Sequence, residues 1–545
     1  MSEKESLVEI KNKYVTSTLS LNLDGSVYTL IDEKLKMTED KHVLIDCLSN
    51  KSWTAKELRI AIIKVGVYLI EIGVKKGDVV AAYCPNSDLQ AIFFFATVAI
   101  GGIYTGCSHL APFPEINKII QETKAAYLLG CKQNLDICEQ LLKNQKSLKK
   151  MFIVDGESNA NFASVLSIIN EKHVGDISNF FLISSTITGE DSAQIVFSSG
   201  TTASPKAILL SHRNIYADFG ETSPEFNMIS EDDTVACYLP FSHVVGSCVL
   251  SLALYGCAKA VIMNSDSGMY KDFQCYKVTS AYIVPAVIDY FNKQEAEKFS
   301  LKKVCSIGDW LPEKVGTEFV QKFKPIYFSQ LYGASETGVV TMHSFNNGVS
   351  DLKSNGVPVF DCTYKIVNKQ TGEALGANEV GEILVKSPQV CKGYLNNPEL
   401  TSQCFDDEGF YKTGDAGYYD ERGNLYFAGR YSSLLKYYGL FISPDEIEEI
   451  LLKHEAVQEV AVVGIDAGVY GQMPKAFVCL CEKFRGKITE KELFDFVNAQ
   501  IEYTKTVEEI EILETLPKTS IGKIDRKKLQ NIIREHHKTY NSVEV

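Results

Sequence analysis

Apolar and β-branched residues gather in short runs along the first part of the chain, and stretches with helical spacing separate these runs. The runs that predict buried strands cover residues 79–83, 126–129, 151–154, 193–197, 234–239, 258–262, 280–284 and 304–307. Strands that alternate with helices predict parallel sheets with helical crossovers. We therefore expect an α/β fold, with two α/β lobes in this part of the chain.

The pattern changes after residue 355. Short apolar segments at 356–359, 364–367, 382–385 and 424–427 are separated by turns rich in Gly and Asn. Turns rich in Gly and Asn are typical of the connections between short strands. It predicts a smaller β subdomain over about 355–430, so that the large N-terminal domain covers residues 1–430.

A further domain is predicted over residues 431–545, where helix signals return. Ser443 is placed as an N-cap, Pro444 as the first helical residue and Glu446 as the partner in a capping box. The apolar face of this helix would consist of Ile447, Ile450 and Leu451. A strand at 460–465 and a second cap, with Thr489 and Glu492, complete a small α+β domain that we expect to be mobile.

Composition excludes several classes of protein. The 545 residues are 45% hydrophobic and 23% charged, which is ordinary for globular proteins and unlike disordered, collagenous or disulfide-scaffold chains. Lys and Arg number 55 against 69 Asp and Glu, a formal net charge of −14. This balance disfavours nucleic acid as a partner but leaves room for a local basic pocket.

Location signals point to the cytoplasm. The 15 Cys are scattered and are interpreted as reduced thiols, and residues 1–12 are charged rather than a secretory signal. The longest apolar run, 91–104, contains two glycines and is shorter than a bilayer span, which favours a buried core helix. The residues 543–545 are Val-Glu-Val and not a peroxisomal Ser-Lys-Leu signal.

Four segments carry polar residues suited to nucleotide chemistry. In the first, at 195–206, a strand enters a hydroxyl-rich loop that holds a glycine and ends in a lysine. Its candidate phosphate-binding residues are Ser198, Ser199, Gly200, Thr201, Thr202 and Lys206. Backbone N–H groups, hydroxyls and an ammonium group form an anion cradle, although no GxxxxGK[ST] motif occurs in this segment. A polar surface turn is the alternative.

The second segment, at 330–337, combines an aromatic ring, a tight glycine, a hydroxyl and a carboxylate. Its residues Gln330, Tyr332, Gly333, Ser335 and Glu336 suit base stacking, phosphate contact and Mg²⁺ ligation. By itself this segment is an ordinary loop.

The third and fourth segments lie closer to the C-terminus. Asp415, in the segment 411–415, can accept the two hydroxyls of a ribose, and Arg430 follows at 429–430. Lys523, in the segment 517–526, lies on a turn that contains glycine. A solvated basic tail is the alternative for this last segment.

In this order and spacing, the four segments resemble the adenylate-forming superfamily, which includes acyl-CoA synthetases, adenylation domains of peptide synthetases and beetle luciferases. The resemblance is closest to the 4-coumarate–CoA ligase and luciferase branch and covers about residues 40–530. Secondary markers agree, at 239–243 with His243, at 381–383, at 392–396 and at 435–439 with Lys436.

The resemblance implies an ATP-dependent carboxylic acid–CoA ligase with Mg²⁺, in fatty acid or phenylpropanoid metabolism. The acid and ATP would give an acyl-adenylate and pyrophosphate, and CoA would then displace AMP. The residues 198–202 and Lys206 would hold the β- and γ-phosphates, Tyr332 would pack near adenine and Ser335 would contact the α-phosphate. Glu336 would ligate Mg²⁺.

Further roles follow from the same resemblance. Asp415 would bind the ribose with help from Arg430, and His243 would line the acyl pocket near the carboxylate, a buried core histidine being the alternative. Lys523 would serve adenylation, and the segment 436–441 would serve thioester formation after the small domain rotates about a hinge near Ser432.

Several positions depart from the family pattern. A bulky Trp310 beside Asp309 replaces two small residues and would reshape the acyl pocket. The remaining departures are Ala203 and Ala207 for glycine, Ser335 for threonine, Ser432 at the hinge, and Phe441 for glutamine. Two alternatives therefore stay open: a luciferase-like monooxygenase and a non-catalytic nucleotide- or acyl-binding homologue. The identity of the acid and the oligomeric state are also open.

Overall fold

The computed structural model describes residues 6–159, 161–171, 175–198, 206–263, 268–295, 299–349, 351–437, 440–467, 472–500, 507–518, 524–526 and 528–532. These residues form two compact units. The first contains residues 6–311, 315–364 and 385–411, and the second contains 312–314, 365–384 and 412–532. The predicted domain boundary at 430/431 remains a prediction.

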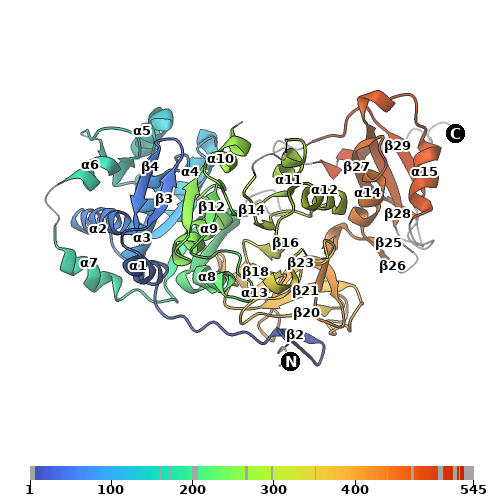
Figure 1. Ribbon diagram of the computed structural model, residues 1–545, viewed down its shortest axis with the longest axis horizontal. Coiled ribbons are helices and arrows are strands. Elements are labelled where there is room, and N and C mark those ends of the chain that lie inside the picture. Colours follow the sequence, from blue (N-terminus) through green and yellow to red (C-terminus); the bar gives the residue numbers. More distant parts are fainter. Residues whose placement is uncertain are drawn as a thin grey trace. The chain divides into compact units, whose positions relative to one another are not determined.

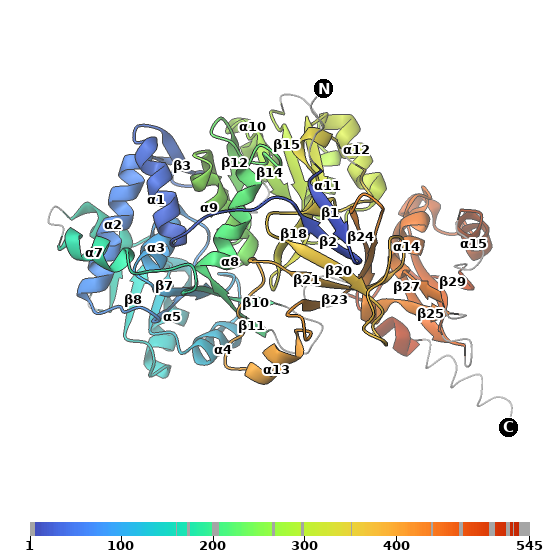
Figure 2. The same cartoon turned by 90° about the horizontal axis from the view of Figure 1, so that it is seen from below.

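The first sheet of unit 1 has eight strands in the order β22-β11-β10-β6-β5-β7-β8-β9. Their bounds are β5 Val79–Ala82, β6 Ile103–Gly106, β7 Tyr127–Gly130, β8 Lys150–Ile153, β9 Phe162–Ser164, β10 Ser192–Ser198, β11 Lys206–Ser211 and β22 Gly393–Tyr394. The pairs from β10 to β9 are parallel, whereas β10–β11 and β11–β22 are antiparallel. The parallel part of the sheet therefore ends at β10, and β11 and β22 form an antiparallel edge. Figure 2 shows β10 and β11 side by side.

The second sheet has seven strands in the order β16-β15-β14-β12-β13-β3-β4. Their bounds are β3 His42–Asp46, β4 Lys51–Thr54, β12 Thr234–Cys237, β13 Lys259–Ile262, β14 Ser280–Ile283, β15 Lys303–Ser306 and β16 Tyr327–Gln330. Only the edge pair β3–β4 is antiparallel among these strands, which the structure describes in full. The predicted α/β lobes are confirmed, with each predicted strand present within one or two residues.

Helices pack against these two sheets, as Figure 1 shows for α1, α2 and α3 at the N-terminal end of the chain. Their bounds are α1 Val27–Met37, α2 Ala55–Glu71, α3 Asp88–Ala99, α4 Phe113–Thr123, α5 Leu135–Asn144, α6 Val165–Asn170, α7 Ile177–Ser184, α8 His212–Tyr216, α9 Val244–Tyr255, α10 Met269–Cys275, α11 Pro285–Asn292, α12 Glu313–Phe323 and α13 Pro398–Gln403. The start of α2 is set by a capping box between Thr54 and Glu57.

The apolar run at 91–104 forms two elements instead of one. Every residue of α3 is buried, as expected for a core helix, but Ile103 and Tyr104 already belong to β6. Gly101, at φ +77°, ends the helix and turns the chain into the strand. Among the residues that the structure describes, no helix has both the length and the hydropathy needed to cross a membrane.

Smaller strands complete unit 1. They are the hairpin of β1 Val8–Lys11 and β2 Tyr14–Ser17, and the sheet of β17 Tyr332–Ala334, β18 Gly338–Met342 and β19 Val357–Pro358. The hairpin β17–β18 begins two residues after β16 ends, so it extends from the carboxyl edge of the second sheet. Ligands bind at this edge in parallel α/β sheets.

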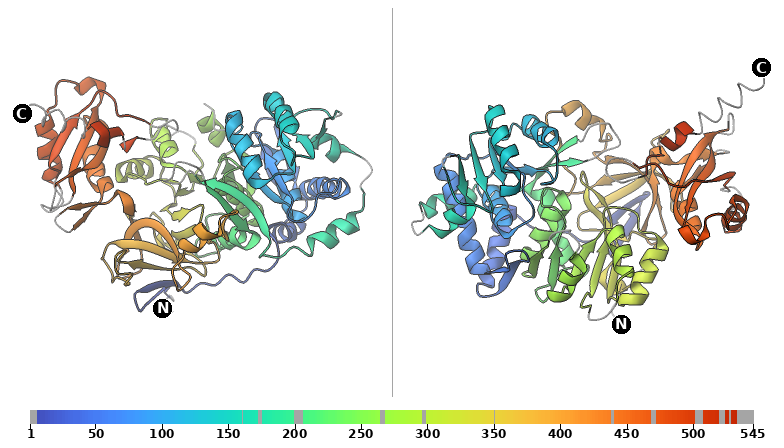
Figure 3. Two further views of the ribbon diagram at one scale, coloured as in Figure 1. Left: turned by 180° about the vertical axis from the view of Figure 1, so that it is seen from behind. Right: turned by 90° about the horizontal axis from the view of Figure 1, so that it is seen from above.

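Unit 2 contains the rest of the predicted β subdomain and the C-terminal elements (Figure 3). Three strands lie mainly in unit 2: β20 Thr363–Val367, β21 Gly381–Lys386 and β23 Tyr411–Tyr419, of which residues 363–364, 385–386 and 411 belong to unit 1. The strands wholly within unit 2 are β24 Leu425–Arg430, β25 Leu435–Tyr437, β26 Leu440–Ile442, β27 Val457–Asp466, β28 Gln472–Leu480 and β29 Glu509–Ile512. Its helices are α14 Pro444–Leu452 and α15 Glu490–Asn498.

The three-stranded sheet β27-β28-β29 is covered on both faces. Val460 and Val462 pack with α14 and α15, whereas Ala461 and Val463 pack with Leu516 and residues nearby. The alternation follows from the two-residue period of a strand. Ile447 and Leu451 of α14 are fully buried, which confirms the predicted apolar face of that helix.

The two predicted capping boxes of unit 2 differ in outcome. Thr489 and Glu492 form the expected reciprocal bonds at the start of α15. Ser443 is the N-cap of α14, but its hydroxyl makes no capping bond, so the predicted capping box with Glu446 is wrong. Asp445 and Glu446 still place negative charge in the first turn, where it favours the helix dipole.

We expect His212 to make unit 1 sensitive to acid. The ring is fully buried, its Nδ1 accepts a hydrogen bond from the Val27 N–H, and burial lowers its pKa to about 4. The unfolded chain takes up this proton below its ordinary pKa of 6.5, so stability is complete above that pH and falls as the pH approaches 4. The loss should reach about 3 kcal/mol.

The measurement is chemical denaturation of the wild type and of His212→Asn between pH 7.5 and 4. The asparagine keeps an acceptor for Val27 but does not titrate, so its stability should depend less steeply on pH. Some slope should remain because burial also lowers the pKa of His343. Equal slopes for the two proteins would contradict the assignment to His212.

Candidate active site

The first candidate segment is held by the antiparallel edge of the eight-stranded sheet. Ser198 ends β10, Lys206 begins β11, and the two are direct register partners. Strand pairing therefore brings both ends of the predicted phosphate loop together, although seven residues separate them. Ser199, Gly200, Thr201, Thr202 and Ala203 lie outside the described residues.

The second segment forms the β17–β18 hairpin. Tyr332 is buried, and a Cβ built on Gly333 would lie 2.3 Å from the carbonyl oxygen of Gly338, so no larger residue fits there. The Ala334 N–H donates to the Thr337 hydroxyl over 3.0 Å, which closes the turn. This turn presents the half-buried Ser335 and Glu336 at its tip.

Glu336 joins the first two segments. The Ser198 hydroxyl donates to Glu336 Oε1 over 3.2 Å, and the Tyr394 hydroxyl donates to the same oxygen over 3.4 Å. Lys206 Nζ lies 5.1 Å from the centroid of the Tyr394 ring, within the range of a cation–π contact. A carboxylate, two hydroxyls and an ammonium group thus meet beside the loop.

Tyr394 and Tyr411 are the functional candidates that sequence reasoning left without a role. Tyr394 is in β22, and its hydroxyl lies 3.0 Å from that of Tyr411, the first residue of β23. Burial raises the pKa of both phenols, so they stay protonated at neutral pH. Both tyrosines lie in segments that the sequence analysis singled out, 392–396 and 411–415. The fold brings Tyr411 to Tyr394 and Tyr394 to Glu336.

The side-chain oxygen of Gln330 is already engaged in a hydrogen bond within the protein. Gln330 is buried at the end of β16, where its Oε1 accepts a hydrogen bond from the Leu311 N–H over 2.8 Å. The bond anchors the segment after β15 in which Asp309 and Trp310 stand. Asp309 is exposed, and its Oδ1 accepts a hydrogen bond from the Trp310 N–H over 2.9 Å.

His243 is an exposed N-cap and not the buried core histidine that was the alternative. Its Nδ1 accepts a hydrogen bond from the Val245 N–H, and desolvation by surrounding protein atoms lowers its pKa, which favours the neutral ring. Gly246 allows the close packing here, because a Cβ on it would lie 2.1 Å from the Pro240 carbonyl oxygen.

A buried carboxyl supports the hairpin from behind. Asp218 accepts hydrogen bonds from the Val339 N–H over 3.3 Å and from the Cys248 thiol over 3.5 Å, which ties β18 to α9. Burial raises the pKa of Asp218 and of its neighbour Glu221. Neither residue stood out in the sequence, because no motif marks a carboxyl whose importance comes from burial.

The remaining candidates belong to unit 2. Asp415 in β23 pairs in register with Arg430 in β24, and Arg430 Nη1 lies 3.0 Å from Asp415 Oδ1. Lys436 is in β25, opposite Phe441 in β26. Lys523 lies outside the described residues.

Comparisons with known proteins identify the family of the chain. Residues 31–395 match the family described as AMP-binding enzyme, and residues 446–523 match its C-terminal domain. The chain therefore belongs to the AMP-binding enzymes of the adenylate-forming superfamily, as the resemblance predicted.

Among similar proteins, 4-coumarate–CoA ligase 4 of Arabidopsis thaliana is 28% identical over 501 residues, which is 89% of this chain and 87% of that protein. Probable 4-coumarate–CoA ligase 2 of Dictyostelium discoideum is 30% identical over 526 residues, 92% of this chain and 94% of that protein.

Solved structures share the fold. ATP-bound MatB from Rhodopseudomonas palustris has a TM-score of 0.80 at 23% identity and covers 95% of this chain and 99% of its own. The anthranilate CoA ligase AuaEII, in complex with anthranoyl-AMP, has a TM-score of 0.79 at 24% identity. The match covers 94% of this chain and 98% of the AuaEII chain.

We predict that Gly333→Ala disrupts the candidate site. The added methyl group would overlap the Gly338 carbonyl, so the hairpin must open, at a cost of about 1–3 kcal/mol. The denaturation midpoint should fall and ATP binding should weaken together. Gly268→Ala is the control, because Gly268 has φ −103° and the nearest atom to its built Cβ is 3.9 Å away. Equal behaviour of the two variants would refute the packing argument.

Proposed function

We propose that the protein is an ATP-dependent carboxylic acid–CoA ligase that forms AMP. The observation that carries the proposal is the meeting of Glu336 with Ser198 and with the Tyr394 ring that contacts Lys206, at the two ends of one hydroxyl-rich loop. Two relatives named as 4-coumarate–CoA ligases, similar over about nine tenths of the chain, support the choice of reaction.

The first half-reaction must overcome repulsion between anions. An oxygen of the acid's carboxylate forms a bond to the α-phosphorus of ATP, and the bond to the bridging oxygen breaks, so that pyrophosphate leaves with the electron pair. Lys206, the loop hydroxyls and backbone N–H groups would offset the phosphate charge. Ser335 would contact the α-phosphate, and Tyr332 and Gly333 would border the adenine.

The site chemistry fits Mg²⁺. Glu336 offers a carboxylate beside the hydroxyl oxygens of Ser198 and Tyr394, and Mg²⁺ is usually bound through one or two carboxylates together with substrate phosphates. Within the described residues, no group of three or more His, Cys, Asp or Glu side chains could hold a metal ion. The ion would neutralise charge on the polyphosphate, and Glu336 would hold it.

Unit 2 would supply the remaining groups. Asp415 would accept the ribose hydroxyls, with Arg430 holding the carboxylate in place, and Lys523 would stabilise charge during adenylation. In the second half-reaction, the CoA thiolate attacks the acyl carbon and AMP leaves. The strand that carries Lys436 would serve this step after a rotation near Ser432.

The acyl group would be bordered by His243, whose neutral ring can approach an apolar substrate without the cost of burying a charge. The relatives' names favour hydroxycinnamates or related acids, in phenylpropanoid-type or fatty acid metabolism. We place the reaction in the cytoplasm. The luciferase-like alternative is not favoured, because these relatives are named as ligases.

We predict that AMP and pyrophosphate release depends on both an acid and CoA. The measurement is AMP release with a panel of short to long fatty acids, cinnamates and other aryl acids, each with and without CoA. At least one acid should give multiple turnovers only when CoA is present. ATP binding without turnover for every acid would instead support a non-catalytic homologue.

We further predict that Lys523→Ala separates the half-reactions. Loss of the ammonium group should reduce acid-dependent exchange of pyrophosphate into ATP by about 100-fold or more, a typical loss for one charge-stabilising donor. Thioester formation from a supplied acyl-adenylate should change far less. Lys528→Ala removes an exposed lysine five residues further along the chain and is the control. Full exchange activity in the Lys523 variant would exclude the assigned role.

A further inference from the structure

Tyr394 stands between two groups of opposite charge. Its ring faces Lys206 Nζ at 5.1 Å, and its hydroxyl reaches Glu336 Oε1 at 3.4 Å. The structure describes Lys206 and Glu336 and shows no ion pair between them. Both charged groups therefore contact the tyrosine and not each other.

The backbone around Tyr394 is anchored on both sides. β22 pairs with β11 so that Tyr394 is opposite Ile208, and the Leu395 N–H donates to the Ala207 carbonyl. The Tyr394 N–H donates to the Thr401 hydroxyl over 2.9 Å. The side chain is 8% exposed. These bonds fix the base of the tyrosine to the strand that begins with Lys206.

The direction of the hydrogen bonds follows from counting protons. A phenol has one hydrogen, and that of Tyr394 is donated to Glu336, so Tyr394 must accept the hydrogen of Tyr411 across the 3.0 Å contact. Phe405 packs edge-on against the Tyr411 ring, with centroids 5.5 Å apart, which limits movement of that phenol. The result is a directed chain from Tyr411 through Tyr394 to the carboxylate.

Two hydroxyls of the protein, from Ser198 and Tyr394, end on the same oxygen of Glu336. Two donors on one oxygen restrict the rotation of the carboxylate, and no hydrogen bond from the described residues ends on its second oxygen, Oε2. A hydrogen bond to a metal-binding carboxylate orients it, and removing such a partner commonly weakens metal binding by 10–100-fold.

We propose that Tyr394, supported by Tyr411, is a positioning residue that orients Glu336 toward the magnesium ion of MgATP and holds Lys206 beside the same phosphates. This inference rests on the proposed function for the identity of the nucleotide. It adds that the hydroxyl and the ring of one tyrosine have separable effects, the hydroxyl on the metal and the ring on the lysine.

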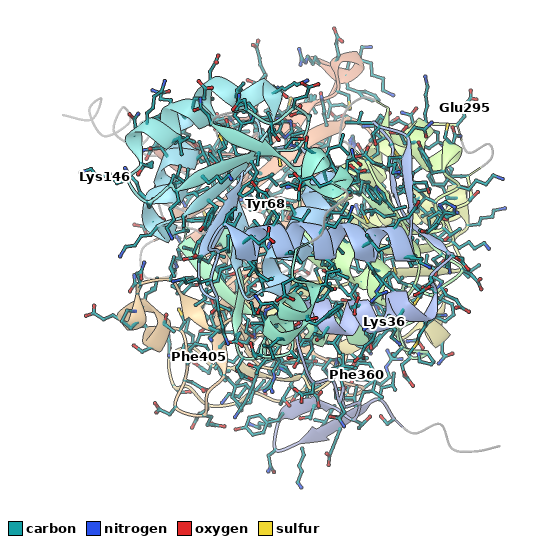
Figure 4. The ribbon with its side chains drawn as sticks, turned by 90° about the vertical axis from the view of Figure 1, so that its left-hand side faces the viewer. Lys36, Tyr68, Lys146, Glu295, Phe360 and Phe405 are labelled. Atoms are coloured by element: carbon teal, nitrogen blue, oxygen red, sulfur yellow. The ribbon has the colours of Figure 1, made fainter. Side chains whose placement is uncertain are left out.

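Three variants separate these effects. Tyr394→Phe keeps the ring and removes the hydroxyl, Tyr394→Leu removes both, and Tyr411→Phe removes only the supporting donor. Tyr68 of α2 provides matched controls, because Lys150 Nζ also lies 5.1 Å from its ring centroid and donates to its hydroxyl over 2.8 Å. Figure 4 shows Tyr68 on this helix. Tyr68→Phe and Tyr68→Leu repeat the two changes outside the candidate site.

The readout is ATP binding by titration calorimetry over a series of Mg²⁺ concentrations, without acid or CoA. Tyr394→Phe should raise by about tenfold the Mg²⁺ concentration that gives half of the maximal effect of Mg²⁺ on ATP binding. ATP binding without Mg²⁺ should stay as in the wild type. Tyr411→Phe should shift it less, in the same direction. Tyr394→Leu should also weaken ATP binding when Mg²⁺ is absent, because Lys206 has lost its contact.

A wild-type Mg²⁺ dependence in Tyr394→Phe would overturn the inference, as would an equal shift in Tyr68→Phe. Thermal melting without ligand shows whether each variant is folded. If Tyr394→Phe does not fold, the Mg²⁺ dependence of Tyr411→Phe decides whether the inference holds. A wild type that binds MgATP but turns over no acid would refute the ligase proposal and leave this inference intact. A wild type whose ATP binding ignores Mg²⁺ would refute the inference alone.

Discussion

The antiparallel pairing of β10 with β11 is the constraint on which the candidate site depends. The neighbouring strands of the same sheet run parallel and are joined by long crossovers, whereas only seven residues of the chain separate the end of β10 from the start of β11. Register then fixes Ser198 against Lys206, and the added strand β22 brings Tyr394 to the same edge. Glu336 meets them because its hairpin leaves the carboxyl edge of the other sheet. Two sheets thus contribute to one cluster of charges.

Much of the fold was predictable because burial leaves a direct mark on the sequence. Strands such as β5 and β12 are continuous apolar runs, and Thr489 with Glu492 formed the expected cap. The run at 91–104 was harder, since apolar character does not distinguish a helix from a strand and only Gly101 marks the change. Ser443 occupies the N-cap position of α14 but makes no capping bond, because the sequence motif shows only that the residues able to form the bond are present.

The candidate site was predictable in its motifs but not in its connections. The resemblance marked Glu336 and Lys206 separately, because each stands in a recognisable segment. That Tyr394 lies between them depends on a strand about 190 residues further along the chain joining β11, and no local pattern encodes such a pairing. The role of Asp218 could not be predicted from local sequence either, because its effect on β18 comes from burial and from two tertiary contacts.

The complete burial of α3 bears on how the chain folds. A helix with no polar face cannot persist alone in water, so α3 gains stability only once its neighbours enclose it. Its first residue, Asp88, accepts a hydrogen bond from Trp53 of β4 and donates its N–H to Asp46 of β3, while β6 follows directly in the other sheet. The two sheets of unit 1 therefore have to consolidate together around this helix. During synthesis, a chain that has emerged only to about residue 100 would carry an apolar segment with nothing yet to cover it, and early chaperone contact would be expected there.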